Sequence, residues 1–175
     1  TKQKICDWEN HESLKLKIIN DIKKLKQVNP FTILSFVDDP KIQKICSENF
    51  IDKAFKYDEI EKDKLITFNK KPKIAYFSSD FKNHPILHLS LDIFKNHDKS
   101  KFEIFGFSLL KNKKDEWNQN IENYFSEFIN VHDKSDQEIA ALSRKMKIDI
   151  AIDLNGFTNE GRQGIFCKRS APIQI

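Results

Sequence analysis

The hydrophobic and polar residues follow different periods in the two parts of the chain. Up to Phe55, apolar side chains recur every three or four positions, which is the spacing of amphipathic helices. From Pro72 onward, short apolar runs alternate with amphipathic segments of helical length. This alternation is typical of strands and helices arranged around a parallel sheet. The pattern predicts a helical lead-in with a connector over residues 1–71 and an α/β domain over residues 72–175.

Two helices are expected in the lead-in. The first lies within residues 12–27, where lysines occupy the polar face. Its apolar positions are Leu14, Ile18, Ile22 and Leu25. Asp39 followed by Pro40 supplies an N-cap and a first-turn proline for the second helix, whose apolar positions run from Ile42 to Phe55. We find no repeat period in this part of the sequence.

The α/β part contains four apolar runs that suit strands. They predict strands at residues 74–77, 102–109 and 148–154, and a weaker one at 128–131. The segments between them predict helices at 85–94, at 115–125 and after Ser135, which forms a capping box with Glu138. The expected fold is a Rossmann-like parallel sheet. No GxGxxG motif follows any of these strands, which argues against an enzyme that uses a nicotinamide cofactor.

Composition narrows the function classes. The 175 residues include 39% hydrophobic residues and 15 Phe, enough for a folded core under a charged surface. The net charge is only +4 and the lysines are spread along the chain, so we expect no nucleic-acid partner. No apolar run suits a membrane span or a signal peptide, so we expect no membrane partner and a cytoplasmic location. Cys6, Cys46 and Cys167 lie far apart, which favours reduced, buried thiols over a zinc site.

Candidate chemistry concentrates where two predicted strands end. The loops 78–85 (SSDFKNHP) and 155–162 (NGFTNEGR) follow the first and third strong strands, and loops at the carboxyl ends of parallel strands meet at one rim. The polar residues there are Ser78, Ser79, Asp80, His84, Asp153, Asn155, Thr158 and Arg162. Each also has a purely structural interpretation: Asp80 caps a turn, Asn155 and Gly156 supply a positive φ, and Arg162 forms a surface ion pair.

Three blocks of the α/β part carry a family resemblance. They are KIAYFSSDFKNHPILHL, KFEIFGFSL and IDIAIDLNGFTNEGRQGIFCKRSAPIQI, and they resemble the first catalytic lobe of the protein O-GlcNAc transferase family, which includes tetratricopeptide-repeat-linked and SPINDLY-like members. The resemblance implies a GT-B arrangement of two Rossmann-like lobes, with the nucleotide sugar held mainly by the second lobe. Because the sequence ends at APIQI, we expect it to stop before that lobe and to be inactive alone.

The resemblance also assigns roles to residues of the two loops. It implies that His84 is catalytic, positioning the acceptor rather than acting as a committed base. Asp153 is a second catalytic candidate, for proton transfer or for orienting a neighbour, with a structural role as the alternative. Asn155 and Thr158 are expected to approach the sugar. Asp80 and Arg162 complete the predicted substrate-binding set, although for Arg162 holding the loop is favoured over touching phosphate.

Five further positions complete the set of expectations. Phe157 replaces the His or Tyr expected between Gly and Thr in this motif, which removes a polar group. His88 is expected to lie in the core or behind His84. Three other histidines are expected at the surface: His11, His97 and His132.

The implied activity is inverting transfer of N-acetylglucosamine, or a related sugar, from a UDP-sugar to Ser or Thr of acceptor proteins. No metal and no other cofactor are expected. The alternative is a noncatalytic α/β scaffold that binds protein partners. The polar loops favour the enzyme, because a scaffold has no need for such a rim.

Overall fold

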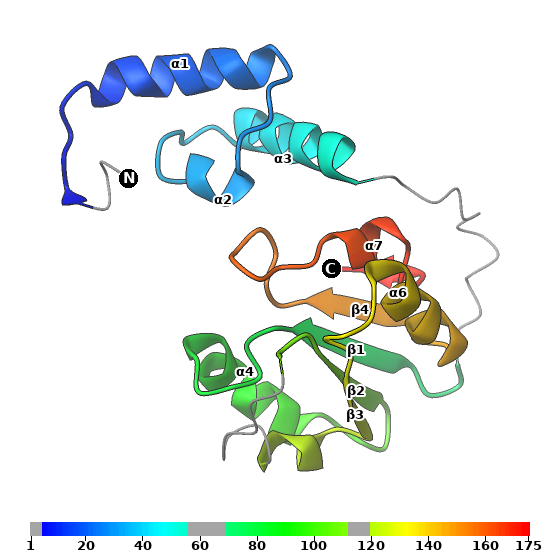
Figure 1. Ribbon diagram of the computed structural model, residues 1–175. Helices are drawn as coiled ribbons and strands as arrows, with labels where there is room; N and C mark the ends of the chain where they lie inside the picture. Colours follow the sequence, from blue (N-terminus) through cyan, green and yellow to red (C-terminus); the bar gives the residue numbers. More distant parts are fainter. Residues whose placement is uncertain (1–4, 56–68, 112–119) are drawn as a thin grey trace. The chain divides into compact units, whose positions relative to one another are not determined.

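The computed structural model describes residues 5–55, 69–111 and 120–175, and the chain divides into two compact units, Thr1–Lys56 and Tyr57–Ile175 (Figure 1). The first unit is helical. It contains α1 (His11–Lys23), α2 (Pro30–Ile33) and α3 (Pro40–Ala54). Both long helices confirm the sequence prediction, whereas the single turn of α2 is too short to show a period. Asp39 caps α3 as expected, because its carboxylate accepts the Lys41 and Ile42 amides.

The core of the helical unit is formed by apolar side chains from all three helices and the turn that follows α2. Its buried members are Ile22, Ile33, Val37, Ile42 and Cys46. Asn49 is also buried, and its Nδ2 donates to the Ile22 carbonyl oxygen at 2.9 Å. This bond joins α3 to the end of α1 and satisfies a polar group inside the core.

The second unit is a five-stranded parallel sheet with the order β3-β2-β1-β4-β5. The strands are β1 (Lys73–Ser78), β2 (Glu103–Ser108), β3 (Glu127–Asn130), β4 (Ile150–Asp153) and β5 (Ile173–Gln174). The predicted Rossmann-like sheet is confirmed, including its weak strand β3. Strand β5 was not expected, since two residues are too few to show alternation. The chain moves outward from β1 to β3 and then returns to place β4 beside β1, which makes β1 and β4 the switch point of the sheet.

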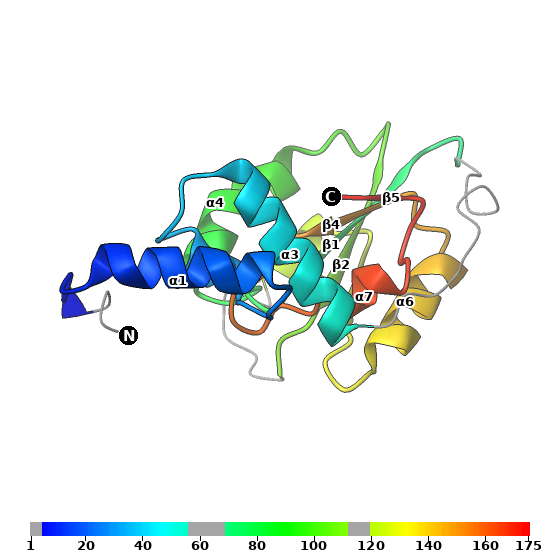
Figure 2. The same ribbon diagram turned by 90° about the horizontal axis from the view of Figure 1, so that it is seen from above.

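Helices cover both faces of the sheet (Figure 2). On one face lies α4 (Pro85–Asn96), whose Leu87 and Phe94 join Ile74 and Tyr76 of β1 in a phenylalanine-rich cluster. The other face is covered by α6 (Asp136–Lys145) and α7 (Gly164–Cys167). Alternate residues of β1 therefore enter different cores, as the two-residue period of a strand requires. Because both faces are buried, β1 reads as a continuous apolar run.

One expectation differs from the structure and another is only partly described. The helix predicted at 115–125 lies partly outside the described residues; within its described part, residues 120–121 are α-helical and are followed by the short 3₁₀ helix η3 (Glu122–Tyr124). The cysteines are all free, but only Cys46 is buried; Cys167 is half-buried and Cys6 is exposed. The prediction of buried thiols was therefore wrong for Cys6, which lies near the beginning of the chain, before the first helix, where no core surrounds it.

Candidate functional site

The candidate site lies where the chain leaves β1 and β4. These strands pair in parallel, with Phe77 opposite Asp153, so their carboxyl ends lie side by side. The first loop, residues 79–84, leads to α4 on one face, and the second loop, residues 154–163, leads to α7 on the other. Ligands of open α/β sheets bind in the crevice that such diverging loops create.

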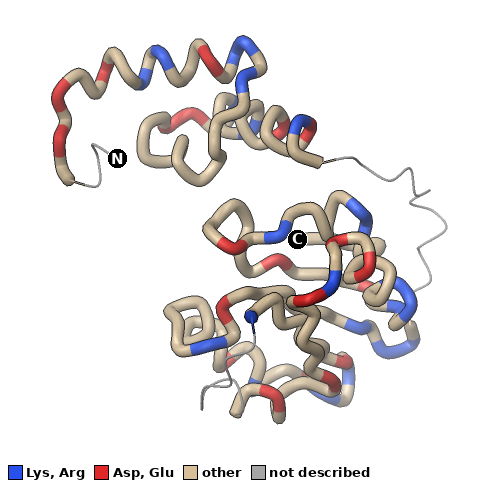
Figure 3. Tube along the Cα trace, in the orientation of Figure 1, with Lys and Arg blue, Asp and Glu red and all other residues tan. Residues whose placement is uncertain are grey.

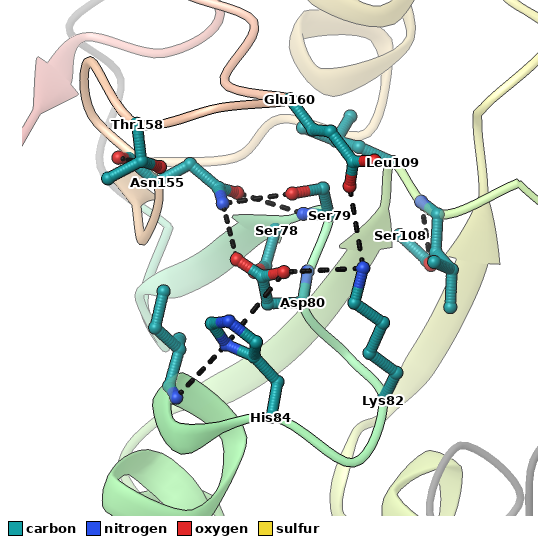
Figure 4. A network of polar contacts seen from close by, with 12 residues as sticks. Ser78, Ser79, Asp80, Lys82, His84, Ser108, Leu109, Asn155, Thr158 and Glu160 are labelled. Atoms are coloured by element: carbon teal, nitrogen blue, oxygen red, sulfur yellow. Dashed lines mark hydrogen bonds and ion pairs between the residues drawn. The ribbon is translucent and has the colours of Figure 1, made fainter. Parts of the chain in front are cut away.

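The side chain of Asn155 joins the two loops (Figure 4). It is buried, with 4% of its surface exposed. Its Oδ1 accepts the Ser79 amide at 2.8 Å, and its Nδ2 donates to Ser79 Oγ at 2.9 Å and to Asp80 Oδ2 at 2.7 Å. Both hydrogens of the amide are therefore used within the protein. We call these three residues, Ser79, Asp80 and Asn155, the loop network.

Asp80 connects the loop network to Lys82 and lies near His84. Its Oδ1 lies 3.5 Å from Lys82 Nζ and 3.8 Å from His84 Nδ1, while Oδ2 accepts from Asn155. The Asp80 backbone amide donates to Ser78 Oγ at 2.9 Å, which fixes the first turn after β1. A carboxylate that is almost fully buried needs such partners, because an isolated buried charge is costly.

His84 is the N-cap of α4, and Pro85 follows it in the first turn. The His84 Nδ1 accepts the Ile86 amide at 3.3 Å, and the side chain keeps 38% of its surface exposed. Because Nδ1 serves as an acceptor, the neutral ring carries its proton on Nε2. The ring therefore offers an N–H donor, and the helix start fixes where it lies.

Asp153 and Thr158 shape the second loop. The Asp153 Oδ1 accepts the Asn155 amide at 2.9 Å, and burial raises the pKa of this carboxyl above its usual range although the amides of Asn155 and Gly156 oppose the shift. Thr158 Oγ1 donates to the Asn155 carbonyl oxygen at 2.7 Å, which leaves the hydroxyl able to accept a further bond. Gly156 has a φ of +53°, a conformation that favours glycine.

Arg162 binds the start of α6 and the segment before it. Its Nε donates to Asp136 Oδ1 at 2.8 Å and its Nη2 donates to the Lys134 carbonyl oxygen at 2.8 Å. A longer contact joins it to the His132 carbonyl oxygen. The guanidinium is thus engaged in holding the end of the second loop, which agrees with the alternative role considered from the sequence. A role in substrate binding stays a prediction.

Sequence reasoning did not single out two charged residues that connect the loops. Lys82 Nζ lies 3.4 Å from Glu160 Oε2 (Figure 4). The only sequence signal was the opposite charge of two residues in facing loops, which is too common among surface residues to be informative. Gly161 was also missed, although a side chain there would collide with the Gly156 carbonyl oxygen.

The histidine expectations need correction. His88 is exposed on α4, so it belongs neither to the core nor behind His84; its Nε2 contacts Asn83 Oδ1 at 2.8 Å. The three histidines expected at the surface are half-buried instead. His97 bonds the Tyr76 hydroxyl, His132 bonds the Leu109 carbonyl oxygen, and His11 stacks on Phe36. Each has an aromatic or backbone partner that is distant in sequence, so local pattern could not reveal it.

The described residues were also searched for metal and membrane sites. Within 5–55, 69–111 and 120–175, no group of three or more His, Cys, Asp or Glu side chains is placed to hold a metal ion. Among the helices in those same ranges, none is long and apolar enough to cross a membrane. Figure 3 shows acidic and basic residues interspersed along the described trace.

Comparison with known proteins gives consistent matches. Residues 5–175 match glycosyl transferase family 41. The probable UDP-N-acetylglucosamine--peptide N-acetylglucosaminyltransferase SEC of Arabidopsis thaliana is 30% identical over 192 residues, which cover 100% of this chain and 20% of that protein. The UDP-N-acetylglucosamine--peptide N-acetylglucosaminyltransferase of Caenorhabditis elegans is 28% identical over 194 residues, covering 99% of this chain and 16% of that protein.

A solved structure has a similar fold. A mutant O-GlcNAc transferase of Thermobaculum terrenum superposes with a TM-score of 0.63 at 22% identity, over 78% of this chain and 26% of that one. The chain therefore spans about a fifth of the length of the first curated relative and about a quarter of the solved structure. The α/β sheet predicted from the sequence corresponds to part of a larger protein in each case.

Proposed function

The chain belongs to glycosyl transferase family 41, and from this membership we propose that it forms the first catalytic lobe of an inverting protein O-glycosyltransferase. The proposed donor is a UDP-sugar carrying N-acetylglucosamine or a related sugar. The proposed acceptors are Ser and Thr hydroxyls of proteins. Two relatives whose printed names specify UDP-N-acetylglucosamine and peptide substrates support this choice. A cytoplasmic location is part of the same proposal.

One observation carries the proposal: beside the loop network at the switch point, the start of α4 holds an imidazole N–H donor. Sugar transfer needs an acceptor hydroxyl fixed opposite the leaving diphosphate, with charge stabilised as it develops. His84 supplies a donor whose position is set by the Ile86 amide and the start of α4. A scaffold without catalysis would have no use for a polar ring held in this way.

The geometry favours a positioning role for His84. The Nδ1 lone pair is occupied by the Ile86 amide, and Asp80 Oδ1 at 3.8 Å is too distant for a hydrogen bond that would stabilise a proton on Nδ1. The neutral ring is therefore a donor from Nε2. We propose that this donor orients the acceptor hydroxyl or the sugar, and that proton acceptance falls to another group.

The other residues of the site have proposed roles that follow from their bonds. Thr158 has acceptor capacity for a sugar hydroxyl. Asp153 has a raised pKa, caused by burial, which makes it a candidate for proton transfer. Asn155 and Asp80 act by holding the loops in register, because their side chains already bind each other. We propose that most donor contacts come from family segments outside these 175 residues, and that no metal takes part.

A transfer assay with the lobe joined to the remainder of the family's catalytic region tests the proposal. His84→Ala should lower turnover by about 100-fold or more, the scale for losing a positioned hydrogen-bonding group in the transition state. UDP affinity should change little. The matched control is His88→Ala, on the same helix but exposed, which should stay near the parent. Near-normal transfer by the His84 variant would remove this histidine from the mechanism, whereas absence of transfer by the parent would favour the noncatalytic scaffold.

A further inference from the structure

Lys82 lies between two carboxylates that belong to different loops. Its Nζ is 3.5 Å from Asp80 Oδ1 in the first loop and 3.4 Å from Glu160 Oε2 in the second loop (Figure 4). The Lys82 side chain keeps 32% of its surface exposed. It therefore forms a link between the loops on the solvent side of the loop network, in addition to the buried link through Asn155.

The charges around Lys82 argue against a role in binding the donor phosphates. One ammonium group faces two carboxylates, so this cluster carries a net negative charge that would repel a diphosphate. The cation of the second loop, Arg162, is paired with Asp136 and with backbone carbonyl oxygens. The ammonium group of Lys82 therefore pairs with carboxylates of the protein's own two loops.

The backbone of the second loop is strained at Glu160. Glu160 has a φ of +64°, a left-handed conformation that costs free energy in a residue other than glycine. The turns around it are closed by backbone hydrogen bonds of 3.2 Å, at the upper end of the usual range. They run from the Thr158 amide to the Asn155 carbonyl oxygen and from the Gly161 amide to the Thr158 carbonyl oxygen. An ion pair at Glu160 is placed to offset that cost.

The two contacts of Lys82 differ in how strongly solvent screens them. Asp80 has 10% of its side-chain surface exposed and also bonds Asn155, whereas Glu160 has 58% exposed. Salt screens exposed pairs far more than buried ones. The contact with Asp80 therefore fixes the lysine, and the contact with Glu160 is the one that can open.

We propose that Lys82 is a positioning residue that holds the second loop closed over the loop network through Glu160. Closure keeps Thr158 and the Asn155 backbone beside the rim that carries His84. The purpose of the closed loop, which is sugar binding, rests on the proposed function. The closure itself does not depend on that proposal. The loop should open locally, without unfolding of the sheet, when this ion pair is removed.

The test measures amide hydrogen exchange by NMR in the 175-residue chain. Lys82→Met should accelerate exchange at Thr158 and Gly161 by about fivefold, the scale expected for one partly exposed ion pair. Glu160→Gln should do the same, and the double variant should add little because both changes remove one contact. Lys82→Arg keeps the charge and should restore the parental rates. In 1 M salt, exchange in the parent should approach that of Lys82→Met.

A matched control separates this effect from the loss of any surface lysine. Lys101 forms an exposed ion pair with Asp98, so Lys101→Met removes a similar pair elsewhere and should leave Thr158 and Gly161 unchanged. Unaltered exchange in Lys82→Met would overturn the proposal, as would equal acceleration at the core residue Phe77. Since exchange needs no catalysis, accelerated exchange in this chain, together with absent sugar transfer when the lobe is joined to the remainder of the family's catalytic region, would count against the proposed function alone.

Discussion

Ser78 and Ser108 end neighbouring strands and form the same local turn. They lie opposite each other in the β1–β2 register, and both are fully buried. The Ser78 Oγ accepts the amide of Asp80, and the Ser108 Oγ accepts the amide of Leu110, each two residues further on. Up to this point the two strand ends are equivalent, and residue type alone does not distinguish a site from a turn.

The bonds beyond these serines separate the two ends. After β1, hydrogen bonds join side chains to one another, because the side chains of Ser79 and Asp80 both accept from the side chain of Asn155. After β2, side chains bond the backbone instead: Asn130 donates to the Leu110 carbonyl oxygen at 3.0 Å, and His132 contacts the Leu109 carbonyl oxygen at 3.0 Å. The comparison shows that polar residues at the carboxyl edge of the sheet can have a purely structural role. The hydrogen-bond partners of these residues, rather than their types, identify the candidate site.

The largest effect on stability is expected from Asn155→Ala. The change leaves the Ser79 amide and Asp80 Oδ2 without the partner that Asn155 provides, in a buried setting. Buried groups deprived of partners cost about 1–3 kcal/mol each, and more when charged. Urea denaturation should show a loss of about 3 kcal/mol in the free energy of unfolding.

Asn130→Ala is the matched control at the other strand end. It removes the bond to the Leu110 carbonyl oxygen and the acceptor for the His132 amide, but Asn130 is exposed, so water replaces both partners. The expected loss is about 1 kcal/mol or less. Equal losses in the two variants would show that the two strand ends do not differ in the way proposed.

The sequence predicted the parallel sheet and the capped helices because these depend on local periodicity and on short capping patterns. It also predicted which loops would meet, since this follows from the sequence order of strands and the rule for parallel sheets. It could not predict that Asn155 bonds Ser79 and Asp80, because residues about 75 positions apart were brought together by packing.

The sequence likewise did not reveal the hydrogen-bond partners of Arg162 and His97. Arg is mostly exposed in proteins and His is intermediate in burial, and nothing near these two residues in the sequence indicates Asp136 or Tyr76 as the partner. The site was therefore predictable as a set of residues, and its internal bonds were not. The assignment of roles to those residues depends on the bonds, so it could not be completed before the structure.

Acid should lower the stability of the fold by protonating His97, which bonds Tyr76 of β1. Its Nε2 lies 2.8 Å from the hydroxyl of Tyr76 in β1, and burial lowers the pKa of His97 below its ordinary value of 6.5. The unfolded chain therefore binds this proton at higher pH than the folded chain. Stability is fully present above pH 6.5 and is lost as the pH falls through the folded pKa.

Urea denaturation at pH 7.5 and pH 5 measures this dependence. His97→Gln should flatten the loss between the two pH values, even if it lowers stability at both. His132→Gln, at the β2–β3 end, is the control and should keep the parental slope. A parental slope in the His97 variant would show that acid acts on the sheet through other groups.

The smallest effect is expected from a substitution that makes the end of β4 resemble the end of β3. Asp153 and Asn130 end β4 and β3, and each accepts the amide of the residue two positions on through Oδ1, at 2.9 Å and 3.0 Å. They differ in charge, and burial raises the pKa of Asp153 above its ordinary value near 3.8. The folded carboxyl thus favours its neutral form, and the stability this contributes is lost as the pH rises through the folded pKa.

Asp153→Asn keeps the Oδ1 acceptor and removes the ionisation that burial disfavours. At pH 7 the variant should be slightly more stable than the parent, by less than about 1 kcal/mol. The difference should shrink as the pH falls toward 4, because the parental carboxyl then becomes neutral too. Denaturation curves at both pH values test this directly. Destabilisation of equal size at pH 7 and pH 4 would mean that the amides of Asn155 and Gly156 hold the carboxylate more strongly than burial opposes it, and that Asp153 is an anchor for the second loop rather than a candidate for proton transfer.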